Sequence, residues 1–167
     1  MQEMVVYGVS FDMIGKQPIV LLKTAHANRF LPIWIGHPEA SAILAKLQES
    51  ETPRPMTHDL LASTLTGLGA DVVRVTVTEM REGTFHARIT VERGSEELEL
   101  DARPSDAIAL ALRAKAPIFA ADDVIEESAI LMEDEAEAGE AAEPEQLVED
   151  FKRFLDDVRP EDFGDDG

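Results

Sequence analysis

The sequence predicts an α+β fold in which mixed or antiparallel sheets are packed by helices. Segments that alternate apolar and polar residues, as strands do, occur in two groups of three. Each group is followed by a segment whose apolar residues recur at helical spacing, and one further helical segment lies between the groups. We therefore expect two β-β-β-α units with an inserted helix.

The first unit covers about the first fifty residues. Met4 to Asp12 and Gln17 to Thr24 are expected strands, and Ile14-Gly15-Lys16 suits the hairpin turn between them. Phe30 to Ile35 is a third strand, in which Pro32 favours an edge or irregular position because proline donates no hydrogen bond. A helix opening at Pro38 follows, with apolar residues at helical spacing: Ala40, Ile43, Leu44 and Leu47.

The inserted helix begins near Thr57, which is a suitable N-cap. Gly67 and Gly69 end the helix in the usual C-terminal manner. Its expected apolar face consists of Leu60, Leu61, Leu65 and Leu68.

The second unit is a meander followed by a buried helix. Turns at Glu82-Gly83 and Gly94-Ser95 separate three expected strands, of which Leu98 and Leu100 make the last one half-buried. Pro104 suits the first helical position, where its missing N–H has no partner to lose. The strands are Val72–Met80, Thr84–Arg93 and Glu96–Asp101, and Pro117–Ala120 and a helix from Asp122 to Ser128 complete the unit.

The two units match without a gap when the chain is shifted by 67 residues. Glu39 then falls on Asp106 and Ile43 falls on Leu110. The match has two interpretations, an internal duplication or chance similarity between alternating strands. If it is a duplication, Glu39 and Asp106 occupy equivalent helix starts and face one groove.

The composition limits the class of protein. The 167 residues, 44% of them apolar, suit one domain plus a tail, and the absence of cysteine excludes disulfides and thiolate metal sites. We see neither an apolar run of about 18 residues nor a signal-peptide pattern, so we expect a cytoplasmic protein with no membrane partner.

The net charge of −19 is unevenly distributed. Residues 130–167 contain 15 acidic and 3 basic residues, a net charge of −12, and the first 129 residues account for the other −7. Binding of nucleic acid normally relies on Lys and Arg that neutralise phosphates. The acidic body therefore argues against a broad duplex-binding surface and favours short single-stranded substrates in a locally basic pocket.

The tail has two expected parts. Residues 131–145 are rich in alanine and glutamate and are expected to be an acidic disordered linker. Residues 146–167 contain an expected amphipathic helix from Gln146 to Val158, which Pro160 ends. Because an isolated helix of this length is marginal in water, we expect it to dock onto its own domain, a sister subunit or another protein partner. Its apolar stripe is Leu147, Phe151, Phe154, Leu155 and Val158.

Four motifs in order resemble the bifunctional nuclease domain, a bacterial and plant family described as acting on RNA and DNA. The resemblance covers residues 1–130, and the tail ending at Phe163 resembles the C-terminal extension of actinobacterial members. It implies an α+β fold, a homo-oligomer with a dimer as the first expectation, and nuclease activity. The motifs are Leu31-Pro-Ile-Trp-Ile-Gly36 with Glu39-Ala40, Pro53-Arg-Pro-Met-Thr-His-Asp-Leu60, Gly83-Thr-Phe85 and Asp101-Ala-Arg-Pro-Ser-Asp-Ala107.

The residues in these motifs include groups suited to phosphodiester hydrolysis, which needs an activated water and positive charge at the phosphoryl oxygens. The expected catalytic residues are His58, Asp59, Asp101 and Asp106, and the expected substrate-binding residues are Arg54, Arg103 and Ser105. A divalent metal ion, Mg²⁺ or Mn²⁺, is the one cofactor considered, and no organic cofactor is expected. Its candidate ligands are Glu39, Asp59, Asp101 and Asp106.

Each of these residues also has a structural interpretation. Asp106 suits a partner of the helix dipole, Asp101 and Arg103 suit an ion pair that fixes the turn, and His58 and Asp59 suit helix capping. Trp34 is expected in the core rather than in base stacking. Two functions therefore stay open. The first is a nuclease or phosphodiesterase with a carboxylate-rich, metal-assisted site. The second is a non-catalytic oligomeric module that binds a ligand or regulates, and that recruits a partner through its C-terminal helix.

Overall fold

The strand-forming segments of the sequence build one eight-stranded sheet in this computed structural model, which describes residues 1–11 and 14–131. The strand order is β6-β5-β4-β7-β1-β2-β3-β8, and all neighbours are antiparallel except β4 and β7. The strands are β1 (Gln2–Phe11), β2 (Pro18–Thr24), β3 (Arg29–Trp34), β4 (Asp71–Arg81), β5 (Thr84–Arg93), β6 (Glu96–Ala102), β7 (Ile118–Ala120) and β8 (Ile130–Leu131).

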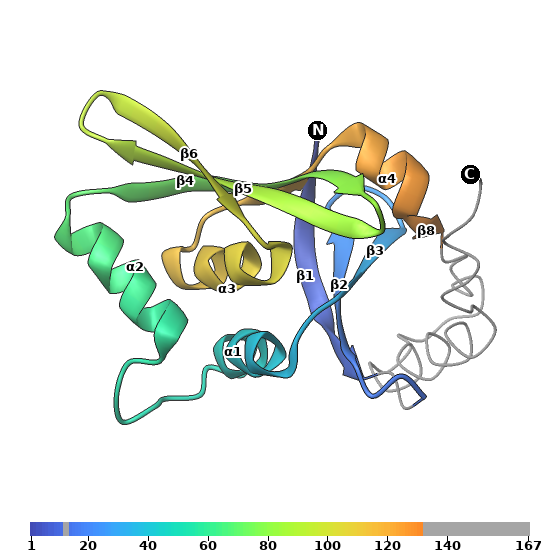
Figure 1. Cartoon of the computed structure of the whole chain (residues 1–167), viewed down its shortest axis with the longest axis horizontal. Helices are drawn as coiled ribbons and strands as arrows, with labels where there is room; N and C mark the ends of the chain where they lie inside the picture. Colours follow the sequence, from blue (N-terminus) through green and yellow to red (C-terminus); the bar gives the residue numbers. More distant parts are fainter. Residues whose placement is uncertain (12–13, 132–167) are drawn as a thin grey trace.

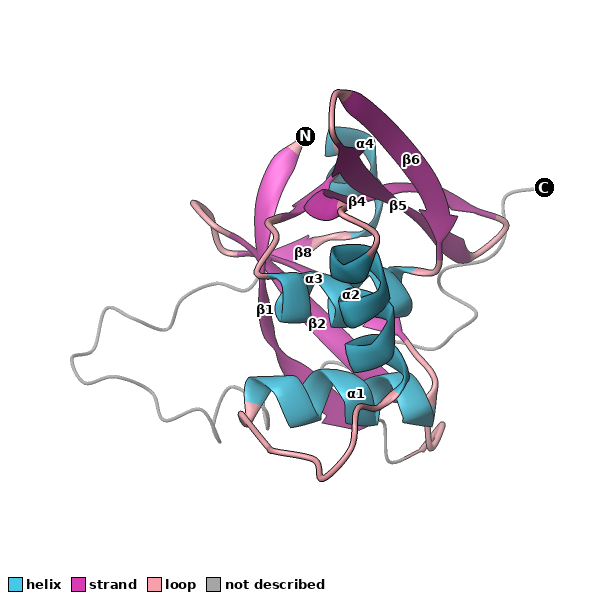
Figure 2. Ribbon diagram, turned by 90° about the vertical axis from the view of Figure 1, so that its left-hand side faces the viewer, coloured by secondary structure: helices cyan, strands magenta, loops and turns pink. Residues whose placement is uncertain are grey.

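Helices α1, α2 and α3 cover one side of this sheet (Figure 1 and Figure 2). Figure 1 shows α3 in the angle between the two meanders, and Figure 2 shows α1, α2 and α3 together in front of the sheet. The α+β prediction with two β-β-β-α units and an inserted helix is confirmed. The helices of the described residues are α1 (His37–Leu47), α2 (Thr57–Gly67), α3 (Pro104–Ala114) and α4 (Asp122–Ser128).

The main core lies between the sheet and helices α1, α3 and α4. Ile108 and Leu110 of α3 and Ile43 of α1 are at most 1% exposed there. The strand residues of this core come from the meander β1–β3 and from the meander β4–β6, and α3 packs against both groups. A second, smaller cluster of buried residues lies on β2 and β3 and consists of Ile19, Leu21 and Phe30, with Ile130 packed against them.

The turn at Glu82-Gly83, the helix end at Gly69 and the edge position of Pro32 agree with the sequence-based predictions. Glu82 and Gly83 both have positive φ, which is the backbone of a two-residue type I′ hairpin. Gly69 follows α2 with φ +70°, as a helix-ending glycine does. Pro32 pairs with Leu21 of β2, and on its other side β8 reaches only Arg29 and Phe30. Pro32 is therefore on an edge, as its missing N–H requires.

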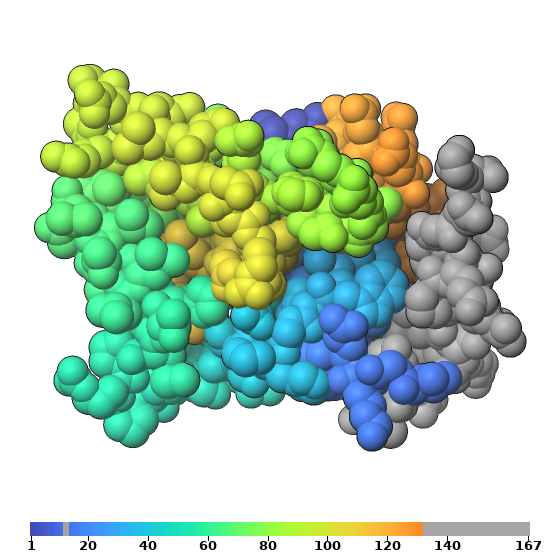
Figure 3. All heavy atoms as spheres, viewed as in Figure 1, coloured from blue at the N-terminus to red at the C-terminus, as the bar shows by residue number. Residues whose placement is uncertain are grey.

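Several expectations about burial are wrong. Trp34 is 39% exposed and not in the core. Leu98 and Leu100 are 49% and 43% exposed, because β6 is the last strand of the sheet and lies beyond the reach of the helices. In α2 the buried residue is His58, while Leu60, Leu61 and Leu68 are exposed. Figure 3 shows α2 and the β5–β6 hairpin together at one end of the molecule.

The two tail predictions, an acidic linker over 131–145 and a helix from Gln146 to Val158, concern residues that lie outside the described part of the chain, except Leu131. The end of the expected first strand at Asp12 lies outside it as well. Among the described residues, no helix is long and apolar enough to cross a membrane.

Candidate functional site

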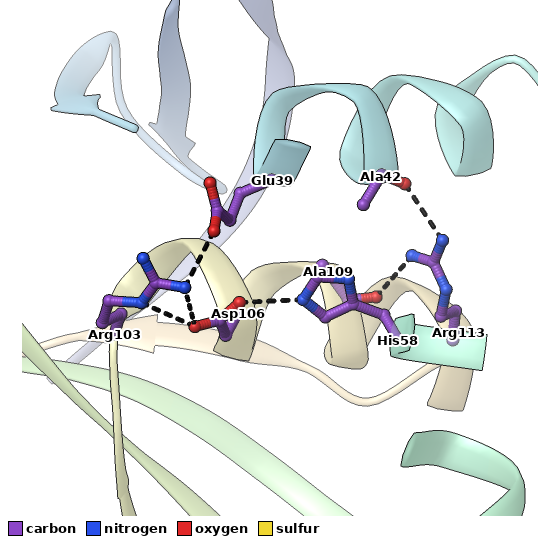
Figure 4. A network of polar contacts seen from close by, with 7 residues as sticks. All are labelled: Glu39, Ala42, His58, Arg103, Asp106, Ala109 and Arg113. Carbon is purple, nitrogen blue, oxygen red and sulfur yellow. Dashed lines mark hydrogen bonds and ion pairs between the residues drawn. The ribbon is translucent and has the colours of Figure 1, made fainter. Parts of the chain in front are cut away.

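Two helix starts bring two carboxylates together. α1 and α3 each have a proline in the first turn and no side-chain cap, and Glu39 and Asp106 are the third residue of their helices. These are the equivalent positions that the 67-residue shift predicts. A carboxylate in a first helical turn is stabilised by the positive end of the helix dipole. α1 packs against α3, so both acidic side chains lie at one edge of the helix pair (Figure 4).

Arg103, the residue before α3, joins the two carboxylates. Its Nε donates to Asp106 Oδ2 at 2.8 Å, and its Nη2 donates to Glu39 Oε1 at 2.8 Å. These hydrogen bonds, that to Glu39 first, raise the pKa of Arg103 above its usual range. Glu39 is largely covered, with 13% of its side chain exposed, whereas 66% of the Arg103 side chain is exposed.

His58 approaches Asp106 from the opposite side. Its Nε2 lies 2.9 Å from Asp106 Oδ1, and only 11% of its side chain is exposed. A carboxylate accepts hydrogen bonds, so the hydrogen-bond network assigns the proton to Nε2 and leaves a lone pair on Nδ1. Asp106 therefore orients an imidazole with one oxygen and a guanidinium with the other (Figure 4).

Asp59 belongs to a neighbouring structural contact. Its Oδ2 accepts a hydrogen bond from the backbone N–H of Met56 at 2.8 Å. Met56 is the N-cap of α2, so the prediction of Thr57 as the N-cap is wrong by one residue. Asp59 Oδ1 accepts a hydrogen bond from Arg113 Nε at 2.5 Å. The hydrogen bond from Met56, followed by the hydrogen bond from Arg113 and the charge of that residue, lowers the pKa of Asp59.

Arg113 is a site residue that sequence reasoning missed. Its side chain is 7% exposed and also donates to the carbonyl oxygens of Ala109 at 2.9 Å and Ala42 at 3.1 Å, so it ties α1, α2 and α3 together (Figure 4). The available signal was its position seven residues after Asp106, which is two turns along the same side of α3.

Gly36, the N-cap of α1, leaves space for the Glu39 carboxylate because it has no side chain. A Cβ at Gly36 would lie 2.2 Å from Glu39 Oε2, so any larger residue would push this carboxylate away. The backbone of Gly36 has φ −76°, which every residue adopts. The glycine therefore leaves room for the carboxylate in this position, and its backbone conformation does not require a glycine.

The remaining predicted residues are not part of this group. Asp101 is exposed on β6, and its side chain makes no hydrogen bond or ion pair within the described residues, so the alternative pair of Asp101 with Arg103 does not form. Arg54 is exposed in the loop before α2. Ser105 is 5% exposed in the first turn of α3. A pocket of about 160 Å³ beside α2, lined by Leu65, Val72 and Arg113 among others, lies away from the His58–Asp106 pair.

The carboxylates do not fit a metal centre in the arrangement that the structure shows. Within residues 1–11 and 14–131, no three His, Asp or Glu side chains are grouped as ligands of one ion. Glu39 and Asp106 meet at Arg103, and Asp59 meets Arg113. A cation between Glu39 and Asp106 would have to displace the guanidinium. The predicted metal ligands therefore stay a prediction.

Comparisons with known proteins give the family context. The model of the bifunctional nuclease domain matches residues 20–133. An uncharacterized protein of Mycobacterium tuberculosis is 41% identical over 164 residues, which cover 98% of each chain. Bifunctional nuclease 1 of Oryza sativa subsp. japonica is 33% identical over 110 residues, 64% of this chain and 33% of the rice protein. The bifunctional nuclease of Oryza minuta matches to the same extent.

Proposed function

Because the chain belongs to the bifunctional nuclease domain family, we propose that it hydrolyses phosphodiester bonds of single-stranded RNA and DNA at the group formed by Glu39, His58, Arg103 and Asp106. The nuclease names of the rice and Oryza minuta relatives support the activity class. The observation that carries the proposal is the double role of Asp106, which holds His58 with one carboxylate oxygen and Arg103 with the other.

Arg103 is the proposed phosphate-binding residue. Its Nε and Nη2 face Asp106 and Glu39, and its Nη1 makes no hydrogen bond to the described residues. The Arg103 side chain is two-thirds exposed, so its free donors can reach a phosphate oxygen while the two carboxylates fix its plane. Arg54, at the loop before α2, is proposed as a further contact to the nucleic-acid backbone.

His58 is the proposed general base. Its Nδ1 would accept a proton from the water that attacks phosphorus, the bond from phosphorus to the leaving oxygen would break, and that oxygen would take up a proton from solvent. Arg103 neutralises the charge that grows on the non-bridging oxygens. Asp106 stabilises the imidazolium that forms, in the manner of carboxylate–histidine pairs in other hydrolases.

A non-catalytic, oligomeric ligand-binding module is the second candidate. The observation that favours it is the pairing of the carboxylates with arginines and a backbone amide, as a structural network would have. In that case Arg103 binds an anionic ligand without cleaving it.

The test is cleavage of single-stranded RNA and DNA oligonucleotides by purified protein, with EDTA, Mg²⁺ or Mn²⁺. We expect the variants His58→Gln and Arg103→Gln to lose cleavage, while Arg88→Gln, an arginine 50% exposed on β5, keeps it. Binding of oligonucleotide by the wild-type protein, without cleavage under any of these conditions, would support the module. Cleavage that requires Mn²⁺ or Mg²⁺ would support the predicted metal.

A further inference from the structure

The face of β1, β2 and β3 that points away from α1 and α3 is strongly apolar. Ile19 and Leu21 of β2 and Phe30 of β3 form its centre, and Ile130 of β8 packs against them. Tyr7 of β1 contacts the Phe30 ring edge-on with 5.2 Å between centroids. Trp34 lies on the same face, because it pairs directly with Ile19.

This face needs a covering layer that the described helices do not supply. Six of the seven β2 residues are buried, including successive residues that point to opposite faces of the sheet. Val20 and Leu22 belong to the main core beneath the helices, whereas Ile19 and Leu21 point the other way. Among the described residues, α1, α3 and α4 contribute to the main core, to which Val20 and Leu22 also belong. A strand buried on both faces requires a layer on each.

We infer that residues 146–158 of the same chain form this layer, as an amphipathic helix lying across β1, β2 and β3. Their apolar residues recur at positions i, i+4, i+7, i+8 and i+11, which places them on one side of a helix. A helix of this length is about 20 Å long, close to the length of strand β2, about 23 Å. The stripe consists of Leu147, Phe151, Phe154, Leu155 and Val158.

The position where the described chain ends supports this occupant. β8 pairs with β3, and Ile130 is itself part of the apolar face, so the chain leaves the fold at the border of the face. The 14 residues from 132 to 145 can span up to about 45 Å, which is several times the width of three strands. The segment therefore reaches the face without strain.

The charges are complementary as well. Lys23 lies on this face, with its ammonium 5.4 Å from the centre of the Phe30 ring. The proposed helix carries Asp150 and Asp157 beside its apolar stripe. Such acidic residues at the border of the stripe can pair with Lys23, while the aromatic residues cover Phe30.

The fluorescence of Trp34 tests the proposal, because this residue is the only tryptophan of the chain. In the full-length protein, Phe151→Gln with Phe154→Gln should shift the Trp34 emission to longer wavelength and increase its quenching by acrylamide. The matched control is Lys152→Gln with Arg153→Gln, on the opposite side of the same helix, and should leave both unchanged. Equal spectra for the two double variants would overturn the proposal.

Cross-linking identifies the occupant and does not depend on the stability of a variant core. The chain has no cysteine, so Tyr7→Cys with Phe154→Cys introduces one defined pair. A bismaleimide should give a cross-linked monomer at all protein concentrations, whereas Leu98→Cys with Phe154→Cys should give none. A covalent dimer instead would show that the face is covered by a second copy, and no product would show that residue 154 does not lie there. Either result contradicts docking of the chain's own segment.

Discussion

At the scale of single residues, the site depends on how one guanidinium is placed between two acids. Arg103 is mostly exposed, and it keeps its position because Glu39 is held under Gly36 and Asp106 is fixed by the first turn of α3. The free energy of an exposed ion pair is small, about 0–1 kcal/mol, so this arrangement serves orientation more than stability.

Substitution of Gly36 tests that placement. Gly36→Ala should displace the Glu39 carboxylate and break its contact with Arg103, since the new Cβ would lie 2.2 Å from Oε2. In a double-mutant cycle of urea unfolding with Arg103→Gln, we expect a coupling free energy of about 1 kcal/mol. Gly67→Ala, where a Cβ meets no atom within 4 Å, should be additive with Arg103→Gln. Additivity of Gly36→Ala would contradict this role of the glycine.

At low pH, Asp59 should contribute less to the stability of the folded protein. Its pKa is lowered in the folded protein, mainly by the Met56 N–H, so its stabilising effect is complete above the unfolded pKa of about 3.9 and is lost as the pH falls through the folded value. Asp59→Asn should therefore destabilise the protein at pH 7 and approach the wild type below about pH 4 in urea titrations. The control Glu82→Gln, at an exposed turn position between β4 and β5, should leave the free energy of unfolding close to that of the wild type at both pH values. A difference that persists undiminished in acid would refute the assignment.

At the scale of elements, the period of the apolar pattern predicts helices and strands well but does not predict their burial. The β6 residues Leu98 and Leu100 alternate as a half-buried strand does, yet the strand is at the sheet edge, where no helix covers it. Trp34 points away from the main core, to which its neighbours Ile33 and Ile35 belong, so aliphatic neighbours in the sequence do not predict its burial. The contact of His58 with Asp106, 48 residues apart, depends on the packing of α2 against α3, which no local pattern encodes.

The end of α3 is predicted to be suboptimal. Lys115 caps this helix with φ +55°, a left-handed conformation in which a Cβ is unfavourable. Lys115→Gly should therefore stabilise the protein by about 0.5–1 kcal/mol in urea unfolding. Lys115→Ala removes the same charge but keeps the Cβ, and should give no gain. Equal effects of the two substitutions would show that backbone strain is not the cause.

At the scale of the whole molecule, the exposed leucines at one end favour self-association. Leu98 and Leu100 lie on an edge strand, and Leu60 and Leu68 of α2 are also exposed. We propose a homodimer that buries the β6 leucines, and expect Leu98→Gln with Leu100→Gln to give a monomer in size-exclusion chromatography with light scattering. Ile14→Gln, at an exposed turn residue, should leave the mass unchanged. A wild-type monomer at high concentration would rule out the dimer.

The whole fold also explains why the site could be predicted only in part. The first-turn acids Glu39 and Asp106 follow from the repeat, and the motif around Arg103 is visible in the sequence. Asp101 and Asp59 are predicted from the same motifs but do not join the group around Arg103. The direction of the Asp101 side chain at the end of β6, and the hydrogen bond of Asp59 to the N-cap of α2, depend on neighbouring elements that the local sequence does not specify.

The most direct measurement of the central claim is the rate at which Asp106→Asn cleaves a single-stranded oligonucleotide. Asparagine keeps the shape of the side chain but removes the charge that orients His58 and Arg103. We predict that the rate falls about 100-fold or more, the scale of general acid–base catalysis, while Asp123→Asn in the first turn of α4 cleaves like the wild type. Equal rates for both variants and the wild type would contradict the proposed site.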